Sequence, residues 1–323
     1  MVAMTAGRHR AGRIGAALTA LALLAAETAP AAFPGTPGSI VYSKTLTREL
    51  VHPGSHSRFR TTGGLFGHGP HVSEAPRQLT FDPRDWAPSF SADGRMIVFE
   101  GRADRFNPGI YVMNSDGSGR RLLTEDARQP SFFPDSRRIA FMRDGRIFAI
   151  RIDGSGLRQI TNSRFPDHEP TVSPDGETIA FVRTRKNNED IFVVASNGGT
   201  PRLLIDRRSD DDDPEWAPDG DRIAFTSNRR GCYPGIYVAR ADGRRIRRLT
   251  PCDRLHNFPA FSPDGRHVIA LDHDDGNAIS LVRSDRAGVV GVFDRGRLEP
   301  GRGRYVGSSV GSASWGPRAR IAG

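Results

Sequence analysis

A short sequence recurs along this chain, and the spacing of its copies constrains the fold more than any other feature. Each copy begins with proline and runs through an Asp-Gly or Asp-Ser pair into an apolar stretch. The copies start at Pro88, Pro130, Pro170, Pro214 and Pro259. Their turn aspartates lie 42, 40, 44 and 45 residues apart, at Asp93, Asp135, Asp175, Asp219 and Asp264. Repeats of about 40 to 45 residues built from short strands are typical of β-propeller blades.

Each full copy is predicted to contain four short strands. In the copy with the clearest pattern, residues 89–91 form the first strand and residues 96–100 the second, with Ala92-Asp93-Gly94 as the turn between them. Residues 110–114 and 121–124 form the third and fourth strands. An Asp-Gly turn between β-rich runs is a strong short-range signal for a hairpin.

The two ends of the repeat region complement each other. Residues 39–43 resemble a second strand with no first strand before it, and residues 312–317 resemble a first strand with nothing complete after it. Pairing them adds a sixth blade and leaves no end of the ring unpaired. We therefore predict an all-β, six-bladed β-propeller of four-stranded antiparallel blades, closed by N- and C-terminal strands. The irregular residues 46–75 and 285–311 are predicted to be loops inserted between strands.

The N-terminal residues have the pattern of an export signal. Arg8, Arg10 and Arg13 precede the apolar stretch 14–26, and Ala29-Pro30-Ala31 fits a small-x-small cleavage site. We predict a signal peptide over residues 1–31 and a single propeller domain over residues 32–323, secreted or located in the periplasm or cell envelope. An uncleaved signal anchor is the alternative. The mature chain is predicted to have no transmembrane segment.

The positive charge of the chain does not indicate a nucleic-acid partner. The formal net charge is +9, but the arginines are scattered through every repeat and no nucleic-acid motif accompanies them. We expect a monomer whose partner is a protein or a small ligand.

The repeat resembles the WD40-like repeat of TolB-type propellers. The matching residues include Ser173-Pro174-Asp175-Gly176, Ile179-Ala180-Phe181, Ile110-Tyr111-Val112 and Leu249-Thr250. The resemblance covers residues 39–322 and implies the fold, but it fits several functions, because such repeats occur in TolB, in peptidase propeller domains and in other secreted proteins. TolB carries an α/β domain before its propeller, and we expect no such domain between Ala32 and Ile40.

Polar residues precede the first strand of most blades, where the chain is expected to reach the mouth of the central channel. The ligand-binding candidates there are Asp85, Trp86, Arg128, His168, Glu169, Asp212, Asp213 and Asn257. Polar groups that converge on a concave mouth are the usual starting hypothesis for a binding site. The alternative is a solvated channel without a ligand.

The run Asp210-Asp211-Asp212-Asp213 is the densest charge in the chain. Its carboxylates, near Glu169, are able to hold a hard cation such as calcium or to attract a basic peptide. A solvated acidic loop is the reading that we favour, so we assign no metal and no cofactor, with calcium as the open alternative.

The two cysteines are expected to form a disulfide. Cys232 lies between the second and third strands of its blade, and Cys252 follows the fourth strand. Both loops emerge on the same face of one blade, and an exported protein favours the oxidised pair over two free thiols.

No linear motif of a hydrolase, nucleotide-binding or dinucleotide-binding site is present, so we assign no catalytic residue. The sequence favours an exported, non-catalytic binding or scaffold protein that uses the channel mouth. The alternative is a secreted propeller enzyme, a hydrolase or lyase acting on a carbohydrate or small molecule, because such enzymes draw their acid–base residues from separate blades.

Overall fold

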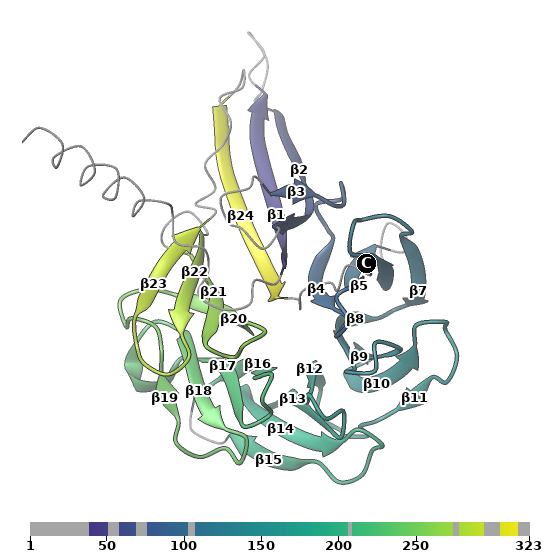
Figure 1. Ribbon diagram of the computed structural model, residues 1–323, viewed down its shortest axis with the longest axis vertical. Helices are drawn as coiled ribbons and strands as arrows, with labels where there is room; N and C mark the ends of the chain where they lie inside the picture. The colour runs from purple at the N-terminus through teal and green to yellow at the C-terminus, as the bar shows by residue number, and fades with distance from the viewer. Residues whose placement is uncertain are drawn as a thin grey trace, which may run out of the picture.

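The computed structural model describes residues 39–50, 58–68, 76–102, 107–205, 209–273, 278–293 and 304–315. These residues form six four-stranded antiparallel sheets arranged around a central axis (Figure 1). The predicted six-bladed, all-β propeller is therefore confirmed. The predicted signal peptide, residues 1–31, lies outside the described part of the chain.

The blades are numbered by their order along the chain, and each is written from its inner to its outer strand. Blade one is β24 (Arg304–Trp315), β1 (Ile40–Leu50), β2 (Arg58–His68) and β3 (Arg77–Gln78). Blade two is β4 (Trp86–Phe90), β5 (Met96–Arg102), β6 (Pro108–Asn114) and β7 (Arg121–Glu125). Blade three is β8 (Arg128–Phe132), β9 (Arg138–Arg143), β10 (Arg146–Arg151) and β11 (Arg158–Gln159).

The other three blades repeat this order. Blade four is β12 (Asp167–Val172), β13 (Thr178–Arg185), β14 (Asn188–Ala195) and β15 (Arg202–Ile205). Blade five is β16 (Asp211–Trp216), β17 (Arg222–Ser227), β18 (Gly235–Arg240) and β19 (Arg247–Arg248), with the short 3-10 helix η1 (Arg229–Gly231) between β17 and β18. Blade six is β20 (His256–Phe261), β21 (His267–Asp272), β22 (Ala278–Arg283) and β23 (Val289–Phe293). No helix in the described ranges is long and apolar enough to cross a membrane.

The repeated Asp-Gly turn folds through its own side chains. In blade four the Ser173 hydroxyl donates to Asp175 and accepts from the backbone N–H of Thr178, while the backbone N–H of Glu177 donates to Asp175 at 2.9 Å. Gly176 has a φ of +74°, which glycine adopts without strain. The repeat sequence thus encodes the hairpin between the first two strands of a blade.

The middle of each of blades one to five contains a stacked aromatic pair with a cationic side chain over it. In blade four Phe181 and Phe192 have ring centroids 6.1 Å apart, and the Arg183 guanidinium lies 4.8 Å from the Phe192 centroid. Arg183 also donates to the fully buried Asp167 at 2.6 and 2.9 Å. A buried charge is stable only when it is paired in this way, so this carboxylate supports the blade and is not available to a ligand.

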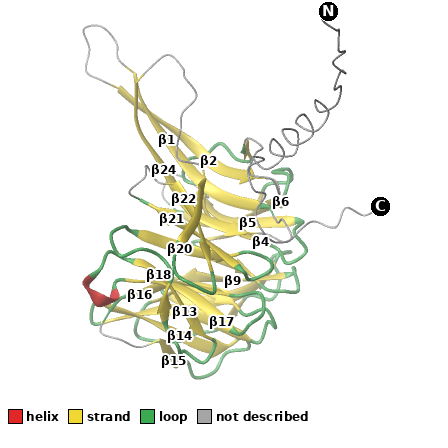
Figure 2. Cartoon of the chain, turned by 60° about the vertical axis from the view of Figure 1, so that its left-hand side comes forward, coloured by secondary structure: helices red, strands yellow, loops and turns green. Residues whose placement is uncertain are grey.

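Blade one closes the ring and differs from the loops predicted in this region. Residues 46–50 and 58–68 belong to β1 and β2, and residues 289–293 and 304–311 of the predicted 285–311 loop belong to β23 and β24. β1 pairs with β2 from Ile40↔His68 to Leu50↔Arg58. The prediction was wrong there because glycines and charged residues hide the apolar alternation. Figures 1 and 2 show β1 and β24 running on beyond the other blades.

Candidate functional site

The inner strands of the blades line the central channel, and five of them share an unusual backbone conformation. In each of these five strands, the residue directly before the proline has a φ between 48° and 54°. These residues are Ala87, Gln129, Glu169, Asp213 and Phe258. The left-handed region costs a non-glycine residue about 1 kcal/mol or more. Pairing with the second strand also shifts register here, for example between His168 and Thr171. Such recurring strain calls for a compensating interaction.

Hydrogen bonds between neighbouring blades supply that interaction. The backbone N–H of Glu169 donates to Gln129 Oε1 at 3.1 Å, that of Asp213 to Glu169 Oε2 at 2.9 Å, and that of Phe258 to Asp213 Oδ2 at 3.2 Å. The backbone N–H of Gln129 donates to Glu100 Oε2 at 3.3 Å. We call this series the inter-blade ladder. It links blades two to six in sequence.

A second set of contacts lies two residues further along the inner strands. The hydroxyl oxygens of Ser314, Ser89 and Ser131 accept from backbone N–H groups of the following blade at 3.3 to 3.4 Å. At the equivalent position in blades four and five, Thr171 donates its hydroxyl to Glu215 Oε2 at 3.1 Å. Because the serines use an oxygen lone pair in these bonds, their hydroxyl protons remain able to donate elsewhere.

The inner strands enclose a cavity of about 260 Å³. Among the described residues, three carboxyl groups line it, those of Glu169, Asp213 and Glu215, and no lysine, arginine or histidine does. The Pro and hydroxyl residues of the inner strands make up half of the other lining residues. In a chain of net charge +9, this cavity is locally acidic.

Two aromatic side chains stand at the other side of the cavity. Trp86 and Phe258 come from blades two and six, which flank the closing blade, and their rings meet edge to face at 5.4 Å between centroids. Both line the cavity. Edge-to-face pairs of this kind are favourable beyond the apolar area that they bury. The pair therefore joins blades two and six directly, across the closing blade that lies between them.

A cluster of acidic side chains extends from the cavity to the mouth beside blades four and five. His168 lies between Glu169 and Glu189, with ring nitrogens 3.6 and 3.5 Å from their carboxylates. Although burial disfavours the charged ring, hydrogen bonds to these two carboxylates raise the pKa of His168 to about 10. Asp212 Oδ1 is buried and accepts no hydrogen bond from any residue that the structure describes. Burial, with the charges of Glu169 and Glu189, raises the pKa of Asp212 to about 8.

The carboxyl groups deeper in the channel are perturbed in the same direction. Burial, with the charges of Glu169 and Asp212, raises the pKa of Asp213 well above its usual range, and burial raises the pKa of Glu215 to about 7. The folded protein therefore retains protons on Asp212 and Glu215 that the unfolded chain releases near 3.8 and 4.5. Their contribution to stability is complete below those values and is lost as the pH rises through 7 and 8.

The structure brings some of the predicted binding residues together at the cavity. Trp86, Glu169 and Asp213 line it, while His168 and Asp212 stand next to Glu169 at the mouth. The sequence pattern suggested that these residues precede the inner strands, but they do not. They lie inside them, because the register shift before each Pro-containing segment lets the strand continue toward the mouth.

Three predicted residues are used elsewhere. Asp85 is buried, and Arg120 donates to it at 3.2 Å. Arg128 is paired with Glu100 at 2.9 Å, and Asn257 Oδ1 contacts His273 Nε2 at 2.9 Å. None of the three lines the cavity.

The acidic run is not the solvated loop that the sequence suggested. Its last three residues belong to β16. Arg229 donates to the buried Asp211, the first residue of this strand. Among the residues that the structure describes, no group of three or more metal-ligating side chains is arranged to hold a metal ion.

Sequence reasoning missed Glu215, Thr171 and the serines of the second set. Aligning the copies at their prolines would have placed Glu215 in register with Ser89, Ser131 and Thr171, and a carboxylate in a column of hydroxyl residues is a usable signal. The sequence gives no comparable signal for the left-handed backbone conformation of the residue before each proline, because a residue in that position usually favours extended conformations.

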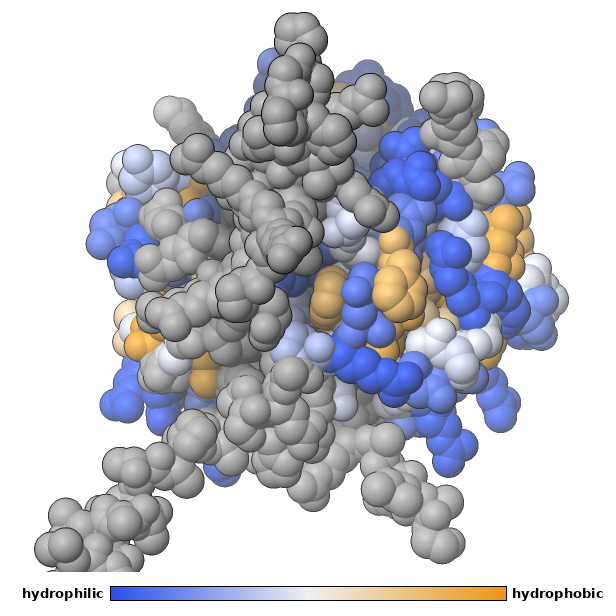
Figure 3. Space-filling model, turned by 90° about the horizontal axis from the view of Figure 1, so that it is seen from above, coloured by the Kyte–Doolittle hydropathy of each residue, from blue (hydrophilic) through white to orange (hydrophobic). Residues whose placement is uncertain are grey.

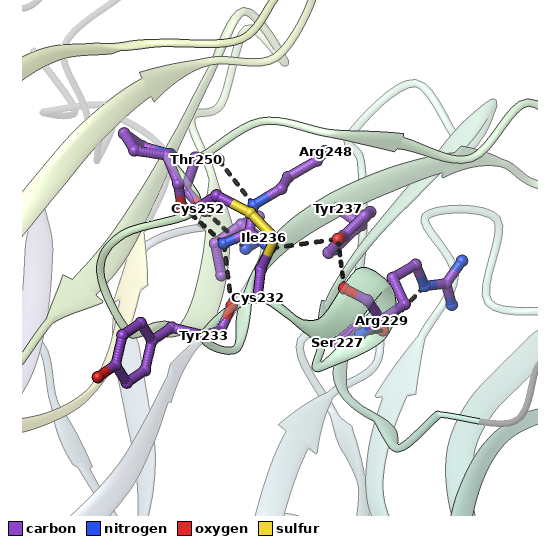
Figure 4. The surroundings of a disulfide bond; sticks show 10 residues. Ser227, Arg229, Cys232, Tyr233, Ile236, Tyr237, Arg248, Thr250 and Cys252 are labelled. Atoms are coloured by element: carbon purple, nitrogen blue, oxygen red, sulfur yellow. Dashed lines mark hydrogen bonds between the residues drawn. A yellow bond between two sulfur atoms is a disulfide. The ribbon is translucent and has the colours of Figure 1, made fainter.

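A disulfide holds two loops of blade five together. Cys232 and Cys252 have Cα atoms 5.2 Å apart and are joined across a separation of 20 residues (Figure 4). Arg248 contacts the same loops through the backbone oxygens of Tyr233 and Pro251, at 3.0 and 2.6 Å. The loop after η1 and the loop before β20 are therefore tied by both a covalent bond and a cation.

Removing this disulfide is expected to destabilise the protein. The double substitution C232S and C252S opens a loop whose closure is worth roughly 3 kcal/mol. Urea denaturation should show a lower free energy of unfolding for the variant, and wild-type protein treated with a phosphine reductant should match it. Alkylation in denaturant without reductant should label no cysteine in native protein; two labelled thiols would contradict the pairing.

Comparison with known proteins agrees with this architecture. Residues 152–292 match the model of the TolB β-propeller domain. A stretch of 120 residues is 33% identical to an uncharacterised protein of Agrobacterium fabrum, over 35% of this chain and 41% of that protein. A stretch of 150 residues is 31% identical to a TolB homologue of Chlorobium luteolum, over 44% of this chain and 33% of that protein. The matches thus span less than half of either relative.

The solved structure of TolB from Acinetobacter baumannii superimposes with a TM-score of 0.66 at 20% identity, covering 87% of this chain and 67% of that one. Six antiparallel blades around a lined channel define this protein as a β-propeller. Its domain match and this structural similarity support a propeller fold like that of TolB.

Proposed function

We propose that this chain is a secreted or envelope-located, non-catalytic binding protein whose channel mouth docks a basic segment of a partner protein. The observation that carries the proposal is Asp212. Its Oδ1 atom is buried beside Glu169 and Glu189 and has no hydrogen-bond partner in the described part of the chain. A buried polar atom without a partner costs free energy, and a cationic group arriving at the mouth would remove that cost.

The rest of the surface favours recognition by charge. The large apolar side chains that are exposed in the described ranges come from different blades or from the link between two blades: Phe81, Leu122, Leu157 and Tyr233. Hydrophilic side chains cover most of the described surface on the side drawn in Figure 3. An apolar docking patch would need several such side chains together, whereas the acidic mouth on a basic protein supplies complementary charge for a basic segment.

The proposal predicts charge-selective binding of a model peptide. At pH 8.5 and low salt, a fluorescein-labelled hexa-arginine peptide should bind the wild type, and a hexa-glutamate peptide should not. Asp212→Asn should weaken hexa-arginine binding about fivefold, a loss of about 1 kcal/mol, because one carboxylate of the mouth is removed. Fluorescence anisotropy measures the dissociation constants.

Asp221→Asn is the matched control. It makes the same charge change in the same blade, but Asp221 is an exposed residue of the turn between β16 and β17, at the opposite face. Its effect on binding should be negligible. Equal weakening by both substitutions would mean that only the overall charge attracts the peptide, and the proposed docking site would be wrong.

A further inference from the structure

The cavity beneath the mouth has two walls of different chemistry. Glu169 and Asp213 of the inter-blade ladder and Glu215 below them come from β12 and β16 of blades four and five. Trp86 and Phe258 come from β4 and β20, on either side of the closing strand β24. An aromatic face attracts a cation through its quadrupole, and a carboxylate attracts it through charge.

From this arrangement we propose that the cavity binds one organic cation, a guanidinium or ammonium group on an alkyl chain, between the carboxyl wall and the aromatic wall. The inference rests on the proposed function, because it supplies the side chain that the docked basic segment inserts. The cavity of about 260 Å³ is smaller than the roughly 300 to 1,000 Å³ typical of pockets for drug-sized ligands. It suits a single side chain or a small amine.

Glu215 is the residue placed to hold the charge. Among the described residues only Thr171 hydrogen-bonds to it, through Oε2, so its other oxygen has no hydrogen-bond partner among them. Asp213, in contrast, already accepts from Thr226 and Phe258 through Oδ2. The ladder therefore fixes Asp213 in place, while Glu215 retains acceptor capacity for a donor group of the ligand.

The serine hydroxyls complete the donor and acceptor set. Ser89, Ser131 and Ser314 line the cavity, and each uses its oxygen to accept a backbone N–H of the next blade. In the part of the chain that the structure describes, no lysine, arginine or histidine side chain lines this cavity to compete for its carboxyl groups. An anion would meet three acidic groups there, and a neutral ligand would leave them without a counter-charge.

Binding of a cation should release protons. Burial holds the pKa of Glu215 at about 7 and that of Asp213 above its usual range, and a cation beside them would lower both values. Affinity should therefore rise between pH 6 and pH 8.5. The ionisable groups that face Glu215 within the cavity are Glu169 and Asp213, so the released protons come from this acidic set.

The test uses isothermal titration calorimetry on the full-length protein. The probes are the end-blocked pentapeptide Gly-Gly-Arg-Gly-Gly, the same peptide with citrulline in place of arginine, and agmatine as a free small cation. The arginine peptide should bind at least tenfold more tightly than the citrulline peptide, which has nearly the same shape without the charge. Glu215→Gln should weaken the arginine peptide about tenfold, and Trp86→Leu about fivefold.

Glu177→Gln is the control, because Glu177 lies in the turn between β12 and β13 and does not line the cavity. It should leave binding unchanged, and thermal melting should show that every variant is folded. Agmatine that binds as tightly as the peptide would identify a free small cation as the source, and much weaker agmatine would identify a partner's side chain; both results support the cavity.

Citrulline binding as strong as arginine binding, or no effect of Glu215→Gln, would overturn the inference. The docking proposal would still hold in that case if hexa-arginine binding remained sensitive to Asp212→Asn. Loss of that sensitivity as well would remove both proposals.

Discussion

A chain that ends before β24 is expected to lose the propeller fold or to melt at least ~10 °C lower. β24 supplies the inner strand of blade one and pairs with β1 from Ile40↔Trp315 outward. It also packs against β4 and β20 of the neighbouring blades. Without it, the buried cluster that contains Ile40 and Tyr42 would lose the cover of Ala313, at about 1.5 to 3 kcal/mol for each large apolar group exposed.

Differential scanning calorimetry of a variant truncated after residue 303 measures this loss. A synthetic peptide of residues 304–315 is added as a second measurement, which applies even if the variant is obtained only as an unfolded chain. The peptide should restore the circular dichroism of the sheet and the melting transition, and the same residues in scrambled order should not. A truncated protein with an unchanged melting curve would show that closure does not depend on β24.

Replacing Asp213 by alanine is expected to destabilise the protein by roughly 2 to 3 kcal/mol, because it removes the acceptor for two donors at once. Thr226 donates its hydroxyl to Asp213 Oδ2 at 2.8 Å, and the backbone N–H of Phe258 donates to the same atom at 3.2 Å. Phe258 also has a φ of 52°, so its N–H is held toward blade five by strained backbone. The melting temperature should fall by about 2 to 4 °C for each kcal/mol lost.

Asparagine at the same position separates the role of shape from that of charge. Burial keeps the Asp213 carboxyl protonated to well above its usual pKa, so an amide reproduces its neutral shape and one acceptor oxygen. Asp213→Asn should therefore cost less than 1 kcal/mol at pH 6, and Asp213→Ala should cost several times as much. Equal losses for the two variants would show that the ladder does not depend on this oxygen.

The sequence carried the fold because the repeat encodes its own turn. Ser173, Asp175 and Gly176 form the hairpin between β12 and β13 through local hydrogen bonds, and these contacts need no information from the rest of the chain. The six-blade count followed from the incomplete copies at the two ends. Blade one was predicted least well, because long pairing between β1, β2 and β24 depends on strands far apart in the sequence.

The candidate site was predicted only in part, for a related reason. Trp86, Glu169 and Asp213 were identifiable because polar or aromatic residues recur at the start of each copy. The use of Glu169 as an acceptor for the next blade's backbone depends on a conformation that a residue before proline rarely adopts. Asp85 was misleading because its carboxylate is polar in sequence but pairs with Arg120 inside the blade.

The register of blade one decides how this protein responds to mechanical load. β1 is antiparallel to both of its neighbours: Leu50 pairs with Arg58 of β2, and Ile40 pairs with Trp315 of β24. The first residue of β1 and the last residue of β24 therefore lie side by side. A force that pulls residues 39 and 315 apart acts across the backbone hydrogen bonds and opens them one pair at a time. The pairing between β1 and β24 should therefore open at low force, while blades two to six stay joined by the inter-blade ladder. Two tethers attached at residues 39 and 315 would start from neighbouring points on the protein.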